Sequence, residues 1–264
     1  MRGNKKPATL AKTVKAMVSN AITKKAETKT AIYYSNSTGL AGDGTYALRS
    51  WAVQNQLISN TVSDLKRMIP FVKPGTGENQ RIGDKVTPLS LTCHGTVKVT
   101  LAELGVLNPN DLFAVIYVLE HVTFKSYSSL IAGNDFTQLL KTGENTTVRF
   151  NGEVWHSQMP VADQYYRLLK KRVIRLRYAG STAAGAVSVA NSHDYLGKFS
   201  LGLSKKQLPL LKYPEDPSTA GANDPLNVAP FFAMGFYWAD GQQYTSPQTL
   251  IETQYVTCMK YKDM

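Results

Sequence analysis

Strand-like patterns of apolar residues dominate the chain from residue 86 onward. Val86 to Leu101 alternates apolar and polar positions around Gly95, and this period of two is typical of a strand with one buried face. Leu112 to Phe124 is apolar at nearly every position, as expected of a strand that is buried on both faces. Four later segments have the same character: Leu168 to Tyr178, Tyr195 to Leu203, Phe231 to Trp238 and Gln254 to Tyr261.

Three other segments give weaker signals. Val148 to Trp155 is predicted to form a hairpin, because Asn151 and Gly152 make the pair that type I′ turns prefer. Ser128 to Lys141 is the one segment of the body with a helical pattern, and Tyr46 to Pro70 mixes polar and apolar residues in a way that leaves room for an edge strand.

Long connections rich in turn residues separate the strands, with Ala179 to Asn191 and Pro214 to Pro225 the clearest. About eight strands with long irregular connections and hardly any helix predict an all-β protein, a single eight-stranded jelly-roll β-sandwich. We assign this domain to residues 46–264 and a basic N-terminal arm and linker, partly helical or disordered, to residues 1–45.

The positive charge is concentrated in the arm. Residues 1–30 hold eight basic residues against the single acid Glu27, a net charge of +7, so the rest of the chain carries only +4 of the total +11. A nearly balanced body with a cationic tail is typical of a protein that holds a polyanion. The arm residues expected to bind nucleic acid are Arg2, Lys5, Lys6, Lys12, Lys15, Lys24, Lys25 and Lys29.

The conformation of the arm stays open. Apolar residues recur at helical spacing and indicate a short amphipathic helix. They are Leu10, Val14, Met17, Val18, Ala21 and Ile22. A solvated tail and an organelle presequence are the alternatives, and the Lys-rich, Arg-poor composition argues against the presequence. No apolar block follows the basic residues and no apolar run is long enough for a membrane span, so we expect synthesis in the cytosol and no membrane insertion.

Residue patterns typical of enzymes are missing from the sequence. The four histidines are scattered, and there is no HExxH, paired CxxC, GxSxG or phosphate-binding loop. His94 follows Cys93, which leaves a metal pair as an alternative to a structural histidine; we expect Cys93 and Cys258 to be reduced thiols. The sequence therefore predicts a binding protein with no catalytic residues, no cofactor and no metal.

A second basic cluster lies in the body, in and beside the strand around residue 170. It could contact nucleic acid, with Tyr165, Tyr166 or Tyr178 stacking on unpaired bases. The alternative is a charged strand edge that discourages aggregation. Its members are Arg167, Lys170, Lys171, Arg172, Arg175 and Arg177.

One short segment resembles a known family. A glycine-containing loop, the run Gln80-Arg81-Ile82-Gly83-Asp84 and a long alternating strand together resemble the start of the jelly roll in capsid proteins of small circular single-stranded DNA viruses that encode a replication-initiator protein. The basic N-terminus and the aromatic strand near the C-terminus are similar to that family too. The layout covers nearly the whole chain, whereas the specific match covers the ten residues from Gly77 to Val86.

The resemblance implies a small icosahedral shell, most simply of sixty copies (T=1). The arm would face a circular single-stranded DNA genome and could direct nuclear import before assembly of the virion. The first shell strand would be Val86 to Leu101 and the last Gln254 to Tyr261. Arg81 could contact a phosphate or carboxylate at the inner surface, or cap a turn. Gly83 would allow a backbone conformation closed to other residues.

A self-assembling coat protein is therefore the leading hypothesis, and its partners would be many copies of itself and single-stranded nucleic acid. Small RNA viruses also use basic-armed jelly rolls, so a coat protein for an RNA genome is the first alternative. A non-viral β-sandwich that binds nucleic acid or carbohydrate is the second. An enzyme whose site forms only on folding is the third.

Overall fold

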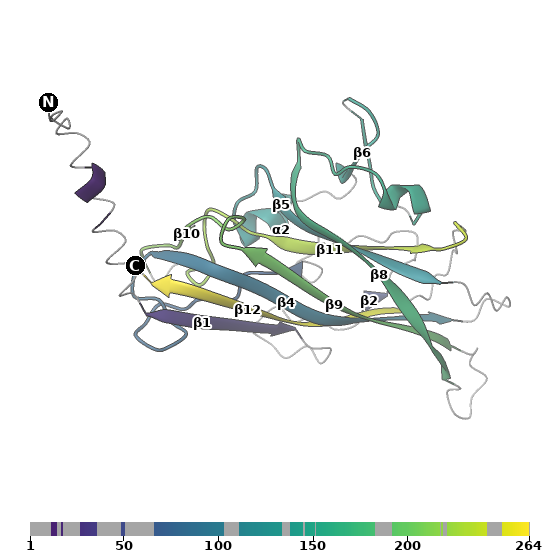
Figure 1. Cartoon of the computed structure of the whole chain (residues 1–264), viewed down its shortest axis with the longest axis horizontal. Coiled ribbons are helices and arrows are strands. Elements are labelled where there is room, and N and C mark those ends of the chain that lie inside the picture. Colours follow the sequence, from purple (N-terminus) through teal and green to yellow (C-terminus); the bar gives the residue numbers. More distant parts are fainter. Residues whose placement is uncertain are drawn as a thin grey trace, which may run out of the picture.

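Strands account for most of the residues that the computed structural model describes. These residues are 12–14, 17, 27–35, 49–50, 66–102, 111–133, 138–144, 146–150, 152–182, 192–216, 218, 221–241 and 250–263. The elements are β1 (Thr28–Ser35), β2 (Arg49–Ser50), β3 (Lys66–Arg67), β4 (Lys85–Ala102), β5 (Leu112–His121), α2 (Tyr127–Gly133), β6 (Leu140–Lys141), β7 (Thr147–Val148), the 3₁₀ turn η3 (Val154–Ser157), β8 (Tyr166–Thr182), β9 (Ser192–Ser204), β10 (Leu211–Lys212), β11 (Phe231–Trp238) and β12 (Leu250–Asp263) (Figure 1).

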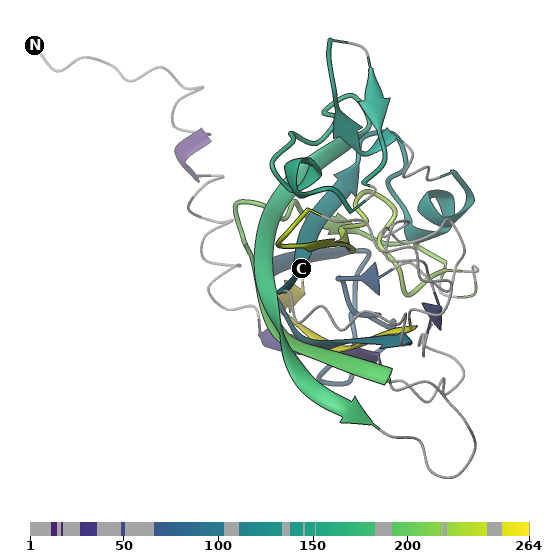
Figure 2. The ribbon, with the colours of Figure 1, turned by 90° about the vertical axis from the view of Figure 1, so that its right-hand side faces the viewer.

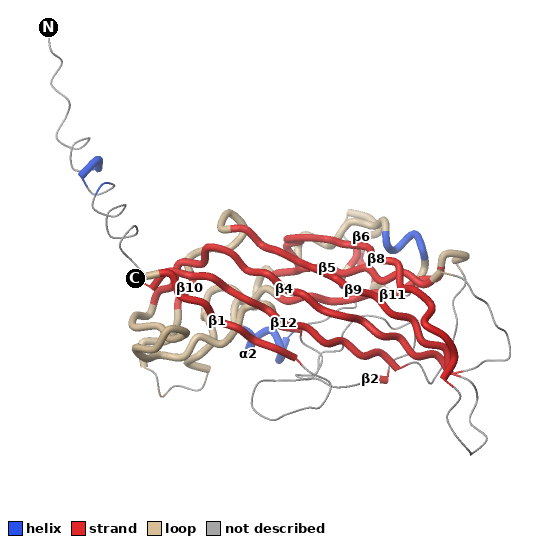
Figure 3. Tube along the Cα trace, turned by 60° about the horizontal axis from the view of Figure 1, so that its bottom comes forward, coloured by secondary structure: helices blue, strands red, loops and turns tan. Residues whose placement is uncertain are grey.

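The main strands form one antiparallel sheet that curls into a half-barrel. Its first part, here called the β4 sheet, has the order β1-β12-β4-β9 (Figure 3). Its second part, the β5 sheet, has the order β8-β5-β11-β3. β8 joins the two, because Tyr166–Leu176 pairs with β5 and Arg177–Thr182 pairs with β9. Figure 2 shows β8 as the long curved strand that passes from one part to the other.

The strand pairs are nested along the chain. β1 pairs with β12, β3 with β11, β4 with β9 and β5 with β8, and every pair is antiparallel. Early strands therefore pair with late ones, and the closest pair in sequence lies innermost. The chain is arranged like one long antiparallel hairpin that has been folded over on itself.

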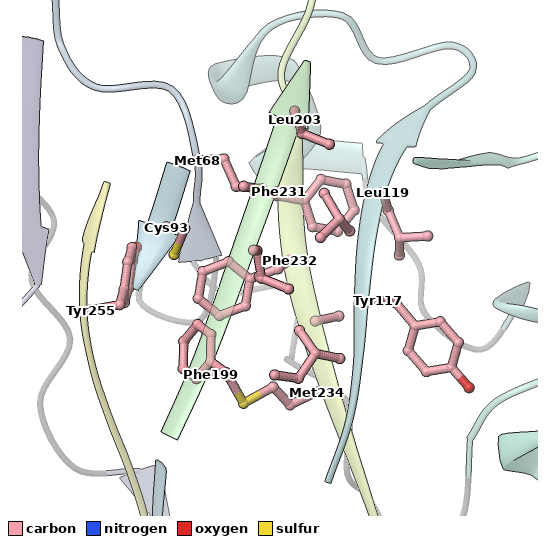
Figure 4. Close-up of a cluster of buried hydrophobic side chains, with 14 of the residues drawn as sticks. Met68, Cys93, Tyr117, Leu119, Phe199, Leu203, Phe231, Phe232, Met234 and Tyr255 are labelled. Carbon is pink, nitrogen blue, oxygen red and sulfur yellow. The ribbon is translucent and has the colours of Figure 1, made fainter. Parts of the chain in front are cut away.

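The core fills the space between the two parts of the sheet. Phe232 of β11 lies with its ring centroid 5.6 Å from that of Phe199 and 4.9 Å from that of Tyr255 (Figure 4). Each such side chain, fully buried, contributes about 1.5–3 kcal/mol. Tyr117 points to the other side of β5, where Phe150 covers it with ring centroids 6.3 Å apart. β5 is thus buried on both faces, as its continuous apolar pattern predicts.

The all-β prediction is confirmed, and each of the strongly patterned segments forms a strand within a few residues of its predicted ends. The prediction that the sheet begins with the strand near Val86 is wrong, because β1 and β3 precede it. β1 also lies inside residues 1–45, so its residues belong to the sheet and not to the arm and linker. Residues 36–45 of that linker lie outside the described residues.

Two smaller predictions are also corrected. The hairpin predicted from Val148 to Trp155 does not form: Gly152 adopts a positive φ of 93°, but the residues after it wind into η3 and bury His156 to 1% exposure. The helix predicted from Ser128 to Lys141 is α2, which ends at Gly133, and the segment's last residues pair as β6. In the predicted arm helix, residues 12–14 and 17 are helical.

Candidate nucleic-acid interface

The cations of β8 line a strand that is only half covered. Alternation along β8 buries Ile174 and Leu176 in the core, as the sequence pattern predicts. Between and beside them, Arg167, Lys170, Arg172, Arg175 and Arg177 are exposed, whereas Lys171 is half-buried.

Two of these cations close the seam where β8 departs from β9. Arg172 Nη1 donates to the carbonyl oxygen of Ser200 at 2.5 Å, and Lys170 Nζ donates to that of Gly202 at 3.4 Å. Among the described strands, none pairs with this side of β9 here, because β8 has turned away to pair with β5. The contacts agree with the edge-protection interpretation for these two residues. Carbonyl groups are neutral, so both side chains keep their net positive charge at the surface.

Two other cations face carboxylates. Arg175 Nη2 lies 2.6 Å from Asp111 Oδ1, and Arg167 Nη1 lies 3.6 Å from Glu120 Oε2. Glu120 also accepts a hydrogen bond from Lys125 at 3.2 Å. Both arginines are more than half exposed, so each pair contributes little to stability and a phosphate could compete for the guanidinium.

Lys171 has a structural position. Its ammonium group donates to the carbonyl oxygen of Ser157 in η3 and lies 5.3 Å from the ring centroid of Tyr117. Partial burial lowers the pKa of Lys171, because desolvation disfavours the charged form. Lys171 therefore anchors η3 to β8.

Folding adds three cations that the sequence reasoning missed. Lys198 lies on the exposed face of β9, and Lys205 and Lys206 lie in the turn after it. Gln207 Nε2 donates to the carbonyl oxygen of Leu169 at 3.0 Å, which holds this turn beside β8. The adjacent pair Lys205 and Lys206 was the one feature of the sequence that could have pointed to these cations. We call the exposed set the basic band: Arg167, Lys170, Arg172, Arg175, Arg177, Lys198, Lys205 and Lys206.

Charge is strongly unbalanced along the basic band. Its β8 part, from Arg167 to Arg177, spans about 33 Å at the usual strand rise. Within the described part of the chain, Asp111 and Glu120 are the carboxylates that pair with it. Such a surface attracts polyanions and raises their local concentration.

The arm residues are mostly beyond what the structure describes. Arg2, Lys5, Lys6, Lys15, Lys24 and Lys25 lie outside the described residues, and Lys12 is helical and exposed. Lys29 contradicts its prediction, because it lies in β1 with 5% exposure and forms an ion pair with Asp263 at 3.3 Å. It supports the sheet and cannot reach a nucleic acid.

Arg81 also contradicts its prediction as a phosphate contact. It is 3% exposed, and its guanidinium donates to the carbonyl oxygens of Gly83 at 2.6 Å, Ala222 at 3.0 Å and Pro214 at 3.3 Å. The guanidinium carbon lies 4.7 Å from the ring centroid of Tyr213. Arg81 thus joins its own loop to Pro214 and Ala222, because buried carbonyl groups need donors.

Among the tyrosines considered for base stacking, Tyr166 is buried at 1% exposure, Tyr165 is half-buried and Tyr178 is 50% exposed. Tyr178 is therefore the one whose ring is most open to a ligand. The proposed metal pair is not supported, because Cys93 is buried and His94 is exposed on the opposite face of β4. Burial raises the pKa of the Cys93 thiol.

The described residues hold neither a metal-binding cluster nor a membrane-spanning helix. They contain no group of three or more His, Cys, Asp or Glu side chains placed to hold a metal ion. They also contain no helix with the length and apolar character needed to cross a membrane.

The arrangement offers exposed cations that could bind a polyanion. Arg175 and Arg177 start from the outer face of β8, whereas Lys170 and Arg172 start from the opposite face and lie at the seam with β9. No known protein-family model matches the chain, and no curated protein matches it.

Proposed function

We propose that the chain is a viral coat protein, a jelly roll that assembles with copies of itself into a small icosahedral shell and packages single-stranded DNA. The observation that carries the proposal is the nested pairing of eight strands: β1 with β12, β3 with β11, β4 with β9, and β5 with β8. A jelly roll arises when an eight-stranded antiparallel hairpin wraps into two facing sheets. The two orders, β1-β12-β4-β9 and β3-β11-β5-β8, are those that such wrapping produces.

Charge supports a coat protein over other jelly rolls. Lectins and cupins also have this fold, so fold alone does not give function. This chain combines its nested strand pairing with an acid-poor N-terminal segment and with the basic band on and beside β8. Phosphate neutralisation by such cations is independent of base sequence, which suits a protein that must package a whole genome.

The position of β1 supports a tail that leaves the domain from one end. Thr28 pairs with Lys262 in register, so the arm joins the sheet beside the last residues of the chain (Figure 1). A cationic segment joined there can extend away from the sandwich without crossing a sheet face. In a shell it would be directed to the interior.

Electron microscopy and light scattering of the full chain test assembly. The proposal expects closed particles of uniform size with co-purified nucleic acid that is digested by a nuclease specific for single-stranded DNA. A species of 29.1 kDa under all conditions would overturn it and favour a non-viral nucleic-acid- or carbohydrate-binding β-sandwich. Particles whose content only ribonuclease digests would favour a coat protein of an RNA virus.

Deletion of residues 1–26 tests packaging separately from folding. This deletion removes most of the arm and keeps β1, including the Lys29–Asp263 ion pair. We expect the shortened protein to fold, with or without forming particles, and to carry much less nucleic acid than the full chain. Undiminished nucleic acid content, at low and high salt, would exclude packaging by the arm.

A further inference from the structure

An exposed tryptophan lies in η3, the turn that Lys171 of β8 contacts. Trp155 of η3 is 54% exposed, whereas Trp238 in the core is 4% exposed. The residues around Trp155 are well packed: His156 is 1% and Ser157 6% exposed. Tryptophan gains much from burial, so an indole held in solvent on a fixed turn points to a ligand.

Packing fixes the direction of Trp155. Its ring centroid lies 4.0 Å from that of His156, and the His156 ring lies 5.9 Å from Phe150. Phe150 in turn covers Tyr117 on the outer face of β5. Trp155 is therefore the outermost ring of a stack that rests on the β5 sheet.

Lys171 ties this stack to β8. Its ammonium donates to the carbonyl oxygen of Ser157, two residues from Trp155, and lies over Tyr117. Lys171 and Arg175 pair in register with Tyr117 and Phe113 of β5, so both start from the same face of β8. The distance along β8 from Lys171 to Arg175 is about 13 Å, which a few nucleotides of an extended strand can span.

We propose that Trp155 stacks on an unpaired base of a single strand whose phosphates lie along Arg175 and Arg177. This inference rests on the proposed function and names a residue that contacts the bases of the packaged strand. Cationic grooves with an exposed aromatic ring bind single strands, because every base has a π-face. In a duplex these faces are already stacked on neighbouring bases, so Trp155 favours single strands over duplexes.

Two variants of the full chain test the stacking. Trp155→Leu keeps an apolar side chain without a π-face, and Trp155→Phe keeps an aromatic ring. The protein is first freed of co-purified nucleic acid at high salt. It is then titrated with a labelled oligothymidylate and with a labelled duplex of the same length, and the fluorescence anisotropy of the label measures binding. We expect Trp155→Leu to weaken oligothymidylate binding about tenfold, Trp155→Phe to restore most of it, and duplex binding to be unchanged by either.

One control variant and the pattern of binding losses separate the possible failures. Val122→Ala changes an apolar residue, 43% exposed, outside the Trp155 stack and should leave binding unchanged. Equal oligothymidylate binding by wild type and Trp155→Leu would overturn the stacking inference and leave the coat-protein proposal standing, as would equal weakening for single strand and duplex. Absence of binding and of particles in the wild type would overturn both.

Discussion

Lys29 and Asp263 join the first and last strands of the sheet. Lys29 Nζ lies 3.3 Å from Asp263 Oδ2, and the two side chains are 4% and 9% exposed. The same carboxylate oxygen accepts the Ile82 amide at 2.6 Å, and Lys29 donates to the Gln80 carbonyl oxygen at 2.9 Å. The start of β1, the end of β12 and the loop before β4 are therefore held by one charged pair.

Replacing Asp263 by Ala should destabilise the protein by about 3 kcal/mol, because it leaves the ammonium of Lys29 buried without its counter-ion. The midpoint of urea unfolding measures the effect. Lys260→Ala changes an exposed residue on the same strand and is the matched control. Equal midpoints for the two variants would show that the pair does not hold β1.

Replacing Arg81 by Lys should cost about 3 kcal/mol, because a single ammonium cannot reach the carbonyl groups that the guanidinium bonds, and unpaired buried carbonyls are costly. Ile82→Ala, at a residue that is 75% exposed, should change stability by less than about 0.5 kcal/mol. Chemical denaturation compares the two. A fully stable Arg81→Lys variant would contradict the structural role.

Stability should fall as the pH drops through the histidine range. His121 Nδ1 accepts the amides of Thr123 at 3.0 Å and Phe124 at 3.1 Å. Desolvation and then the charge of Lys125 lower the pKa of His121. Desolvation also lowers the pKa of His156, against a smaller opposing effect of Glu153.

Because the folded state disfavours protonation of both histidines, their contribution is complete above the unfolded pKa of about 6.5 and is lost as the pH falls toward the lower folded values. His121→Asn keeps an acceptor near Nδ1 and should reduce the loss of thermal stability between about pH 8 and pH 5. His94→Asn, at an exposed position, should not. An unchanged pH profile for His121→Asn would exclude His121 as a contributor.

Gly95 should not tolerate a side chain. A Cβ there would lie 2.5 Å from the Phe199 ring and 2.6 Å from the Gln254 backbone oxygen, whereas a Cβ at Gly202 meets nothing closer than 4.0 Å. We expect Gly95→Ala to cost about 1–3 kcal/mol through overpacking and Gly202→Ala to be neutral or slightly stabilising. Unfolding midpoints measured side by side decide this, and similar midpoints would rule out the close approach.

The salt dependence of DNA binding should show which residues of the basic band contact phosphates. Removing one phosphate contact lowers the slope of log affinity against log salt by about 0.7 for a single strand. Arg177→Gln should show this change. Lys73→Gln removes an exposed cation that lies beside β1, at the far end of the β4 sheet from β8, and should leave the slope unchanged. Equal slopes for Arg177→Gln and wild type would remove Arg177 from the interface.

The sequence alone determined the long strands, because burial of one or both faces leaves a regular apolar pattern. Phe231–Trp238 has the predicted ends, and the continuous apolar run of β5 was correctly interpreted as burial on both faces. β1 escaped detection because apolar side chains lie on both of its faces: Ala31 and Tyr33 are buried, while Ile32 and Tyr34 are 62% and 55% exposed. Its buried face also holds Lys29, which pairs with Asp263, so the segment has no regular alternation of apolar and polar residues.

The cationic segment on β8 could also be predicted from the sequence, because six basic residues lie within eleven consecutive positions. Only the tertiary structure decided their separate roles. Arg172 meets a carbonyl of β9 that is distant in sequence, Lys171 meets η3, and Lys198 joins the band from another strand. Arg81 became a structural residue for the same reason, since its three carbonyl partners include two more than 130 positions away. Local pattern records which face of a strand is buried, whereas the partner of a charged group depends on long-range pairing that a one-dimensional pattern does not contain.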